Sequence, residues 1–430
     1  MKLMFWTLLI CFLPNVSIAK TMEFSQIWEV AKNESYQVQK SKIDKDLAET
    51  QNSRMKWHWT PSVYVRAGYM KTDNAGQSFF ANMSQRAADP TTDFGPTNLN
   101  NPDDTSLTET TLGVAWPLYE GGKYRQLKKS TDEMLQAQIY FEKGQTQKLK
   151  TDLISAYAEI LNHQKNLDDI QPLIKDIEKQ LASYQVGKKS NPVGYSGLLG
   201  LKATYNKAMS YKRISEMQIH SSYNQIQQLV PSLEKGWEVV AAESYDFLKN
   251  HTPLDEAVEA SYFLKGQEHV SQALNYKAKS EKSIMYPNLG VFAESSHFSG
   301  DRDSADSYSY GAYLKWNVGW YSKGQYREAR LKESSNVLTT KMKTAEEVSA
   351  KDSLHVAINS LETTLKDMKE NKKLLNEQLI ISKKLFKNGA INAIQLSGLY
   401  ANIVDVYWGC VETHSKLIEA RTQYYLLTAR

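Results

Sequence analysis

The sequence predicts an α+β protein in which very long helices alternate with two pairs of amphipathic strands. Three observations predict it over the 430-residue chain: long stretches repeat apolar residues with heptad spacing, four shorter stretches alternate apolar and polar residues, and both patterns occur twice in the same order. Each half is predicted to run helix, strand, loop, strand and then two long helices.

The first residues, 1–19, are predicted to be a secretory signal. Lys2 precedes a mostly apolar run over residues 4–13, and Ser17-Ile18-Ala19 offers small residues at a cleavage site. The segment holds one of the 52 basic residues and none of the 48 acidic ones, so its removal lowers the formal net charge from +4 to +3. A charge so near zero indicates no nucleic-acid partner.

The two cysteines indicate that no intrachain disulfide forms. Cys11 leaves with the predicted signal, and its surroundings match a lipoprotein cleavage box only loosely, because Ile10 stands where a small residue is needed. Cys410 then remains without a partner.

The helical segments repeat apolar residues in steps of four and three, a spacing that predicts supercoiled packing against partner helices. From 123 to 170 there is no proline and a single glycine, Gly144, so one helix of roughly 70 Å is expected. Pro172 predicts a bend within one rod, because the apolar stripe keeps its phase beyond it. This stripe comprises Leu149, Leu153, Ala156, Ile160, His163, Leu167, Ile170, Ile174, Ile177, Leu181 and Tyr184, and similar stripes run through 354–379 and 399–427.

The predicted strands place apolar residues on one face and polar residues on the other. The apolar series includes Val63, Val65 and Tyr69 in the first strand and Tyr308, Tyr310 and Leu314 in the last. Together with Trp and Tyr near the strand ends, this pattern fits a membrane barrel. Candidate residues for a barrel lumen are Arg66, Glu109, Glu294 and Lys315.

Four strands are too few to close a barrel in lipid, so the strands are predicted to be shared between subunits. Two copies would give a narrow barrel filled by side chains, whereas three would give a 12-stranded barrel wide enough for a channel. The alternative is a water-soluble sheet whose apolar face is covered by the helices.

The predicted domain order follows the duplication. After the signal at 1–19, the first repeat spans 20–229 with a strand pair at 61–117, and the second spans 253–430 with a strand pair at 287–318. An irregular equatorial segment at 230–252 separates them and is expected to form a belt around the long helices.

Several short motifs recur in both halves with similar spacing. They are the strand starts at Pro61 and Pro287, the strand exit Pro117-Leu118-Tyr119-Glu120-Gly121-Gly122 with a degenerate copy ending at Gly324, and the helical tips Tyr184-Gln185-Val186-Gly187 and Leu385-Phe386-Lys387-Asn388-Gly389. On these motifs, from about Met22 to Arg430, the chain resembles the TolC family of outer-membrane efflux proteins.

The resemblance implies a homotrimer in the outer membrane, with a shared 12-stranded β-barrel and a periplasmic α-barrel made of the long helices. It implies a passive export duct of a tripartite efflux pump or type I secretion system. Its partners would be a periplasmic adaptor, an inner-membrane transporter and outer-membrane lipid. Loops at 71–106 and 299–306 would face outside. The pattern names no cargo, and a surface or periplasmic coiled-coil structural or adaptor protein is the alternative.

The helical tips carry the predicted contact residues. Candidates for adaptor docking are Gly187, Lys188, Ser196, Gly389, Ala390 and Ser397. The best-known family members place aspartates beyond the second tip, where this chain aligns Gln395 and Gly398, and the first tip offers Lys188 and Lys189. The tunnel entrance is therefore predicted to be neutral or slightly basic.

No motif for catalysis, a cofactor or a resident metal occurs in the sequence, so the chain is predicted not to be an enzyme. His163 lies within a heptad stripe and is expected to be a hydrogen-bonded packing residue, and Cys410 is expected to be a small buried hydrophobe. Asp301, Asp303 and Asp306 lack the full ligand set of a calcium site.

Overall fold

The computed structural model describes residues 20–183, 192–233, 236–254, 259–316 and 319–428, so the predicted signal at 1–19 lies outside the described residues. The chain forms two compact units. The sheet unit contains residues 44–139 and 264–343, and the helical unit contains the described parts of 1–43, 140–263 and 344–430. Each unit therefore takes segments from both halves of the sequence.

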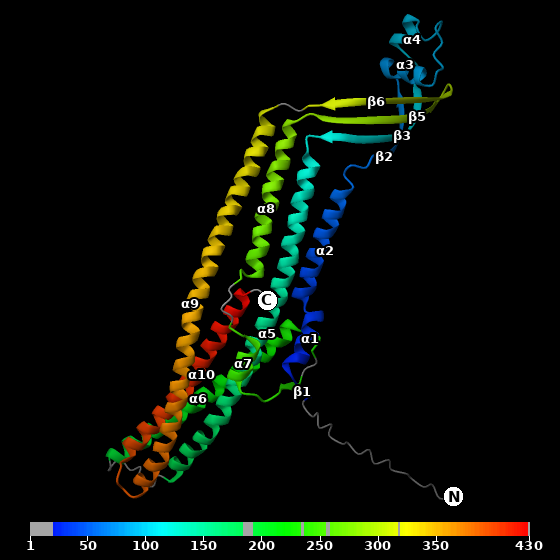
Figure 1. The fold of residues 1–430 in the computed structure, drawn as a ribbon. Coiled ribbons are helices and arrows are strands. Elements are labelled where there is room, and N and C mark those ends of the chain that lie inside the picture. Colours follow the sequence, from blue (N-terminus) through cyan, green and yellow to red (C-terminus); the bar gives the residue numbers. More distant parts are fainter. Residues whose placement is uncertain (1–19, 184–191, 234–235, 255–258, 317–318, 429–430) are drawn as a thin grey trace, which may run out of the picture. The chain divides into compact units, whose positions relative to one another are not determined.

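The order of elements along the chain alternates long helices with two strand pairs (Figure 1). The strands are β1 (Lys20–Met22), β2 (Ser62–Thr72), β3 (Thr105–Glu120), β4 (Trp237–Val239), β5 (Asn288–Gly300) and β6 (Ser304–Lys315). The α-helices are α1 (Phe24–Glu34), α2 (Tyr36–Lys56), α3 (Ala75–Ser84), α4 (Pro96–Asn100), α5 (Lys123–Ser183), α6 (Pro192–Leu229), α7 (Ser244–His251), α8 (Tyr262–Lys282), α9 (Trp320–Lys387) and α10 (Ala393–Leu427).

The sheet unit contains a four-stranded antiparallel sheet in the order β2-β3-β5-β6 (Figure 1). The strand pairs predicted at 61–117 and 287–318 supply its two hairpins. Trp116 of β3 pairs with Val291 of β5, and the register between these two strands then shifts between Pro117 and Tyr119. β2 and β6 form the two edges of this sheet.

The two predicted loops differ in size from expectation. The predicted loop at 299–306 is shorter in the structure, because β5 extends to Gly300 and β6 begins at Ser304. The predicted loop at 71–106 contains the short helices α3 and α4. Residues 73–104 and the turn at 301–303 are called the head below.

The turn from β3 into α5 explains the glycine pair of the repeated motif. Gly121 and Gly122 have φ angles of 63° and 78°, a left-handed backbone that other residues rarely adopt. The degenerate copy behaves differently, since Gly324 lies inside α9. The two motifs are similar in sequence but do not form the same turn.

The longest helices are continuous, as the unbroken stripe predicted. α5 has 61 residues and includes Pro172, and α9 has 68 residues. Pro172 is exposed, whereas its neighbours Leu173 and Ile174 are buried. The packed face therefore stays intact where one backbone donor is missing. Among the described residues, no helix has the length and apolar character required to cross a membrane.

The helical unit contains two apolar clusters. One gathers around Leu153 and Ile160 of α5 with Leu417 of α10, and the other around Ile174 of α5 with Tyr400 of α10. Between these positions along α5 lie buried polar residues, among them Asn162, His163 and Asn166. The stripe predicted for α5 is the buried face of this helix through both clusters, and most of its residues are buried or half-buried.

The segment predicted at 230–252 contributes to the first of these clusters. β4 pairs in parallel with β1, and Trp237, Phe247 and Leu248 pack in the cluster that includes Phe24. The Ser244 hydroxyl donates to the Ala158 carbonyl of α5 at 2.8 Å. The segment is thus fixed to α1 and α5, and its role as a belt stays a prediction.

Candidate functional site

One face of the sheet is polar and hydrogen-bonded, and it contains all four candidate lumen residues. The strand register places Arg66, Glu109, Glu294 and Lys315 on the same side. Arg66 forms an ion pair with Glu109 at 3.0 Å, and the Thr111 hydroxyl donates to the same carboxylate at 2.9 Å. The face is therefore organised as a network across neighbouring strands, and its role in a lumen stays a prediction.

Aromatic rings on this polar face cover glycines of the neighbouring strands. At each of three glycines, an added Cβ atom would lie about 2.3–3.0 Å from the ring of the residue directly opposite. Such rings cover backbone that a glycine would otherwise leave bare. Strand alternation alone did not single out these pairs, which are Tyr64 over Gly113, Tyr313 over Gly290, and Phe292 over Gly311.

The opposite face of the sheet is apolar and exposed. Val65, Tyr308 and Tyr310 are 70%, 80% and 78% exposed, and Val63, Tyr69, Val114 and Leu314 are exposed as well. The alternative of a soluble sheet requires helices over this face, and the exposure of these side chains in the described structure contradicts it. Within the sheet unit, no described residue covers these side chains.

The second helical tip ends in a backbone motif that requires glycine. Gly389 has a φ of 74°, its amide donates to the Phe386 carbonyl at 3.0 Å, and the Ala390 amide donates to the Leu385 carbonyl at 2.9 Å. These two bonds form a Schellman motif, which satisfies carbonyls at the end of α9. Gly389 and Ala390 are exposed.

The start of α10 gives Gln395 a local role. Its side chain accepts from the Asn392 amide at 2.9 Å, and the Asn392 side chain accepts from the Gln395 amide at 2.9 Å. This capping box satisfies two amides at the start of α10. Gln395 and Gly398 are exposed. Their place at a tunnel entrance stays a prediction.

The remaining tip candidates have different surroundings. Ser196 is exposed on α6, whereas Ser397 is buried, and its hydroxyl oxygen lies 2.7 Å from the position of a Cβ atom added at Gly200. Ser397 of α10 therefore packs against α6. Any effect of Ser397 on adaptor docking would come from positioning these two helices. Gly187, Lys188 and Lys189 lie outside the described residues.

The buried polar candidates serve packing. His163 is 5% exposed, its Nδ1 lies 3.1 Å from the Ser215 hydroxyl, and burial lowers its pKa to about 4. This confirms the predicted hydrogen-bonded packing role. Cys410 is only half-buried, and burial raises the pKa of its thiol.

The head is held together by contacts between residues far apart in sequence. Arg302 forms an ion pair with the buried Asp93 at 2.5 Å, and this guanidinium, followed by the Asp89 amide, holds the pKa of Asp93 below its usual range. Asp301 accepts from the Ser106 amide at 2.6 Å and from its hydroxyl at 2.5 Å.

The three aspartates considered for calcium do not act together. Asp301 binds Ser106, Asp303 accepts from the Ser304 amide at 2.8 Å, and Asp306 pairs with His297 at 2.7 Å. Over the described part of the chain, no group of three or more His, Cys, Asp or Glu side chains is arranged to hold a metal ion.

Comparison with known proteins identifies the fold. No protein-family model matches the sequence, and no curated protein sequence matches it either. Solved structures do match over nearly the whole chain. CusC, studied for transmembrane channel formation, superposes with a TM-score of 0.77 at 11% identity, covering 95% of this chain and 92% of CusC.

Two further structures agree with this match. The CmeC outer membrane channel of Campylobacter jejuni has a TM-score of 0.74 at 10% identity, covering 94% of this chain and 86% of its own. The outer membrane protein VceC of Vibrio cholerae has a TM-score of 0.72 at 12% identity, covering 94% and 96%. The chain therefore has the fold of TolC-type outer-membrane channels, as its sequence resemblance to that family predicted.

Proposed function

We propose that this protein is a subunit of an outer-membrane export channel, a passive duct without chemistry of its own. One observation carries the proposal: a single sheet has an exposed apolar face, a hydrogen-bonded polar face and two open edges. A sheet of this kind is stable between lipid on one side and water on the other.

The apolar face supports a membrane environment. Burying a Val, Leu or Phe side chain is worth about 1.5–3 kcal/mol relative to leaving it in water. Val63, Val65 and Leu314, all exposed, lie on one side of the sheet together with Tyr308 and Tyr310 of β6. Lipid would cover them without any rearrangement of the chain.

The open edges support closure by other copies. In lipid, each unpaired backbone group costs several kcal/mol, so the edges at β2 and β6 require partners. The alternating directions of β2, β3, β5 and β6 make the two edge strands antiparallel. β6 of one copy would then extend the antiparallel order of the next, and three copies would close 12 strands around a water-filled lumen lined by the polar face.

The proposal includes the partners of a tripartite pump or a type I secretion system. The long helices would line a periplasmic duct, the tip with Gly389 and Ala390 would meet an adaptor, and an inner-membrane transporter would supply the energy. Support for this part comes from the shared fold and from the exposed reversal between α9 and α10.

Channel activity can be tested on the purified protein in a planar lipid bilayer. We expect a trimer that dissociates on heating in SDS and that conducts ions in discrete steps. Because Gln395 and Gly398 replace acidic residues in the predicted alignment, we also expect weak preference between cations and anions. A monomer that stays in the soluble fraction, or membranes that remain silent with purified trimer present, would contradict the proposal.

A further inference from the structure

Four short segments join the strands of the sheet to the long helices, and all four are basic. They are called the collar below and comprise residues 54–61, 116–126, 279–287 and 316–327. Each segment has two Lys or Arg residues, whereas the whole collar has only two acidic residues, Glu120 and Glu281. The basic residues are Arg54, Lys56, Lys123, Arg125, Lys279, Lys282, Lys323 and Arg327. Since the whole chain has 52 basic and 48 acidic residues, this excess is local.

Three of these cations lie where helix formation alone disfavours them. Lys123 and Arg125 are in the first turn of α5, and Lys323 is in the first turn of α9. Neither first turn contains an acidic residue. The unpaired amides at the start of a helix carry a partial positive charge, so a cation there is unfavourable and an anion is favourable. The position of these three cations therefore indicates an anion from outside the chain.

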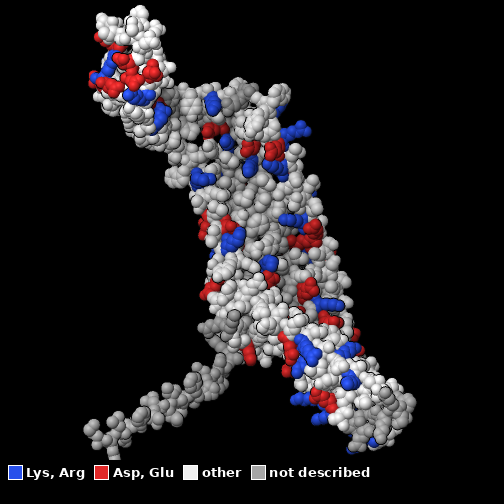
Figure 2. Space-filling view, turned by 180° about the vertical axis from the view of Figure 1, so that it is seen from behind, with Lys and Arg blue, Asp and Glu red and all other residues white. Residues whose placement is uncertain are grey.

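The collar cations are accessible to such an anion. Lys123 is half-buried and the other seven are exposed. Among the residues that the structure describes, none of the eight forms an ion pair with a carboxylate, whereas Lys128, further along α5, pairs with Asp132. Figure 2 shows Lys and Arg side chains at the surface where the long helices meet the sheet. The collar is thus a basic surface without internal neutralisation.

Two tryptophans place the collar at the end of the apolar face of the sheet. Trp116 lies on that face near the helix side of β3, and its Nε1 atom donates to the Trp59 carbonyl at 2.7 Å. Trp316 directly follows β6, and its Nε1 atom donates to the Met285 carbonyl at 3.0 Å. In each half, the accepting carbonyl lies two residues before the proline at the strand start. Both strand pairs therefore end in the same way and at the same level.

Further exposed rings surround these two tryptophans in the collar. Trp57, Trp59, Trp320 and Tyr321 are all exposed. Lys323 Nζ lies 4.9 Å from the centroid of the Trp320 ring. Trp and Tyr side chains collect at the level of lipid headgroups, next to the apolar band of a membrane barrel. The basic residues thus lie where phosphate groups would be found.

The position of the lysines within the helices agrees with this level. Lys56 and Lys282 are the last residues of α2 and α8, and Lys123 is the first residue of α5. A headgroup layer is about 5–8 Å thick, similar to one helical turn of about 5.4 Å. A basic surface that continues an apolar membrane face fits an anionic lipid better than a soluble anion, which would need no apolar neighbour.

We propose that the collar binds the phosphate groups of anionic phospholipids in the leaflet next to the helices, and so fixes the depth of the protein in the membrane. This inference rests on the proposed membrane location of the sheet and adds the class of lipid that the protein selects.

The test is tryptophan quenching by brominated lipids in vesicles that contain the full-length protein. Five of its nine tryptophans lie in the collar, so quenching reports the lipids nearby. Phosphatidylcholine vesicles receive the same fraction of either brominated phosphatidylglycerol or brominated phosphatidylcholine. We expect at least about fivefold preference for phosphatidylglycerol, the effect of one Lys or Arg near an anionic surface. High salt should weaken this preference through screening.

Two triple variants locate the preference. The collar variant combines Lys56→Gln, Lys282→Gln and Lys323→Gln and should bind both lipids about equally. All three positions are exposed, so the variant should keep the fold, which circular dichroism checks. The matched control combines Lys42→Gln, Lys341→Gln and Lys366→Gln, which remove the same charge from exposed positions. These lie about 20 Å or more from the collar along α2 and α9, so the preference should stay at the wild-type level.

The outcomes separate the collar from the proposed function. Quenching by brominated phosphatidylcholine without preference for phosphatidylglycerol would overturn the collar assignment and leave the membrane location intact. An equal loss of preference in both triple variants would overturn it as well, because total charge would then be responsible. Absence of quenching by either lipid would contradict the membrane location itself, and the collar assignment with it.

Discussion

At the scale of single residues, buried ionisable groups make the helical unit sensitive to pH. His414 is 7% exposed, its Nε2 atom has no hydrogen-bond partner in the described structure, and burial followed by the charge of Lys369 lowers its pKa to about 4. A neutral histidine is thus kept in a cavity that Lys165, Asp169, Glu243, Lys372 and Cys410 also line.

Acidification should therefore destabilise the helical unit through His414. An unfolded histidine has a pKa near 6.5, so between about pH 6.5 and 4 the unfolded chain binds a proton that the folded chain does not. The stability that His414 contributes is full above this window and is lost as the pH falls, by at most about 3 kcal/mol. The thermal midpoint of the helical circular dichroism signal at pH 7.5 and pH 4.5 measures this loss together with that of His163, whose pKa is also lowered to about 4.

The variant His414→Gln isolates this effect. The stability difference between wild type and variant should shrink at pH 4.5, because the glutamine side chain takes up no proton in this range. Glu159, whose pKa is raised by burial, titrates in both proteins and cancels from the comparison. His220→Gln, at an exposed position, controls for the loss of a histidine. An unchanged difference between the two pH values would show that His414 is accommodated when protonated.

At the scale of elements, α6 and α10 pack closely through small residues near the second tip. A Cβ atom added at Gly197 would lie 2.3 Å from Ala393 Cβ and 2.7 Å from its carbonyl carbon. Gly398, which follows Ser397 in α10 as Gly197 follows Ser196 in α6, has open space around the same position among the described residues. The duplication predicts equivalent glycines, but the structure gives them different surroundings.

The two glycines should respond oppositely to alanine. Gly197→Ala forces α6 away from α10, and overpacking of this kind costs about 1–3 kcal/mol. Gly398→Ala meets no neighbour among the described residues and should gain up to about 1 kcal/mol from helix propensity. Thermal melting of both variants beside wild type is the measurement. A clear loss at Gly398 would mean that another copy contacts this position.

The elements also show what local sequence can reveal. Period-two alternation located the strands, and the unbroken stripe of apolar residues predicted that α5 continues beyond Pro172. The helices of the head were missed although Asn74 caps α3 through the Gln77 amide, a local signal of the same Asn-x-x-Gln form as Asn392 and Gln395 at α10. What fixes the head is not local, since Gln85 binds backbone 217 residues away in the chain.

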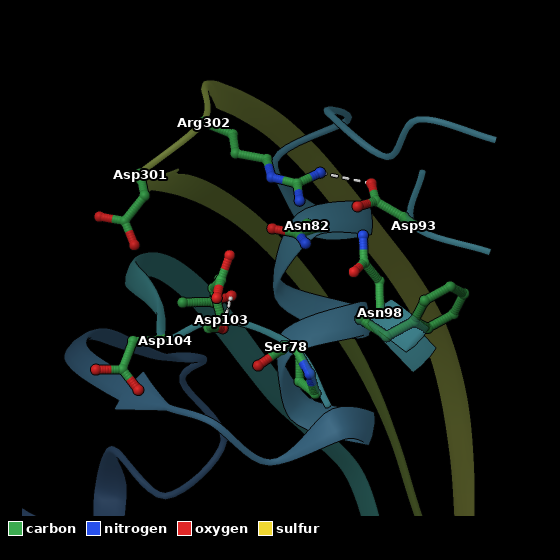
Figure 3. A pocket seen from close by; sticks show the side chains of 11 residues that line it. Ser78, Asn82, Asp93, Asn98, Asp103, Asp104, Asp301 and Arg302 are labelled. Atoms are coloured by element: carbon green, nitrogen blue, oxygen red, sulfur yellow. Dashed lines mark hydrogen bonds and ion pairs between the residues drawn. The ribbon is translucent and has the colours of Figure 1, made fainter. Parts of the chain in front are cut away.

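The candidate site was predictable to a similar degree. Alternation placed Arg66, Glu109, Glu294 and Lys315 on one face, because a strand's side-chain period leaves no other arrangement. The capping role of Gln395 depends on where α10 begins, and the burial of Ser397 depends on how closely α6 packs against α10. The stripe determines neither. The head also has a cavity, lined by Asn82, that joins residues 78–105 with the distant turn at Asp301 and Arg302 and carries no local pattern (Figure 3).

At the scale of the whole molecule, closure of the sheet decides between the proposed ring and other assemblies. An edge-to-edge contact between β6 of one copy and β2 of the next is heterologous, so it forms a ring only if the rotation closes, and otherwise forms an open chain. Both edge strands carry exposed side chains on the apolar face, among them Val65 on β2 and Tyr310 on β6.

Disulfide trapping should capture this ring as a covalent trimer. In a Cys410→Ser background, Val65→Cys combined with a cysteine at Tyr308, Tyr310 or Ala312 should crosslink in at least one register. Non-reducing electrophoresis should then show a series of bands that ends at three chains. Val114→Cys with Tyr310→Cys is the control, because Val114 lies on the inner strand β3, whose neighbours are β2 and β5 of the same chain. A series ending at two chains would indicate a closed dimer, and one without an end would indicate a filament; either result excludes the 12-stranded barrel.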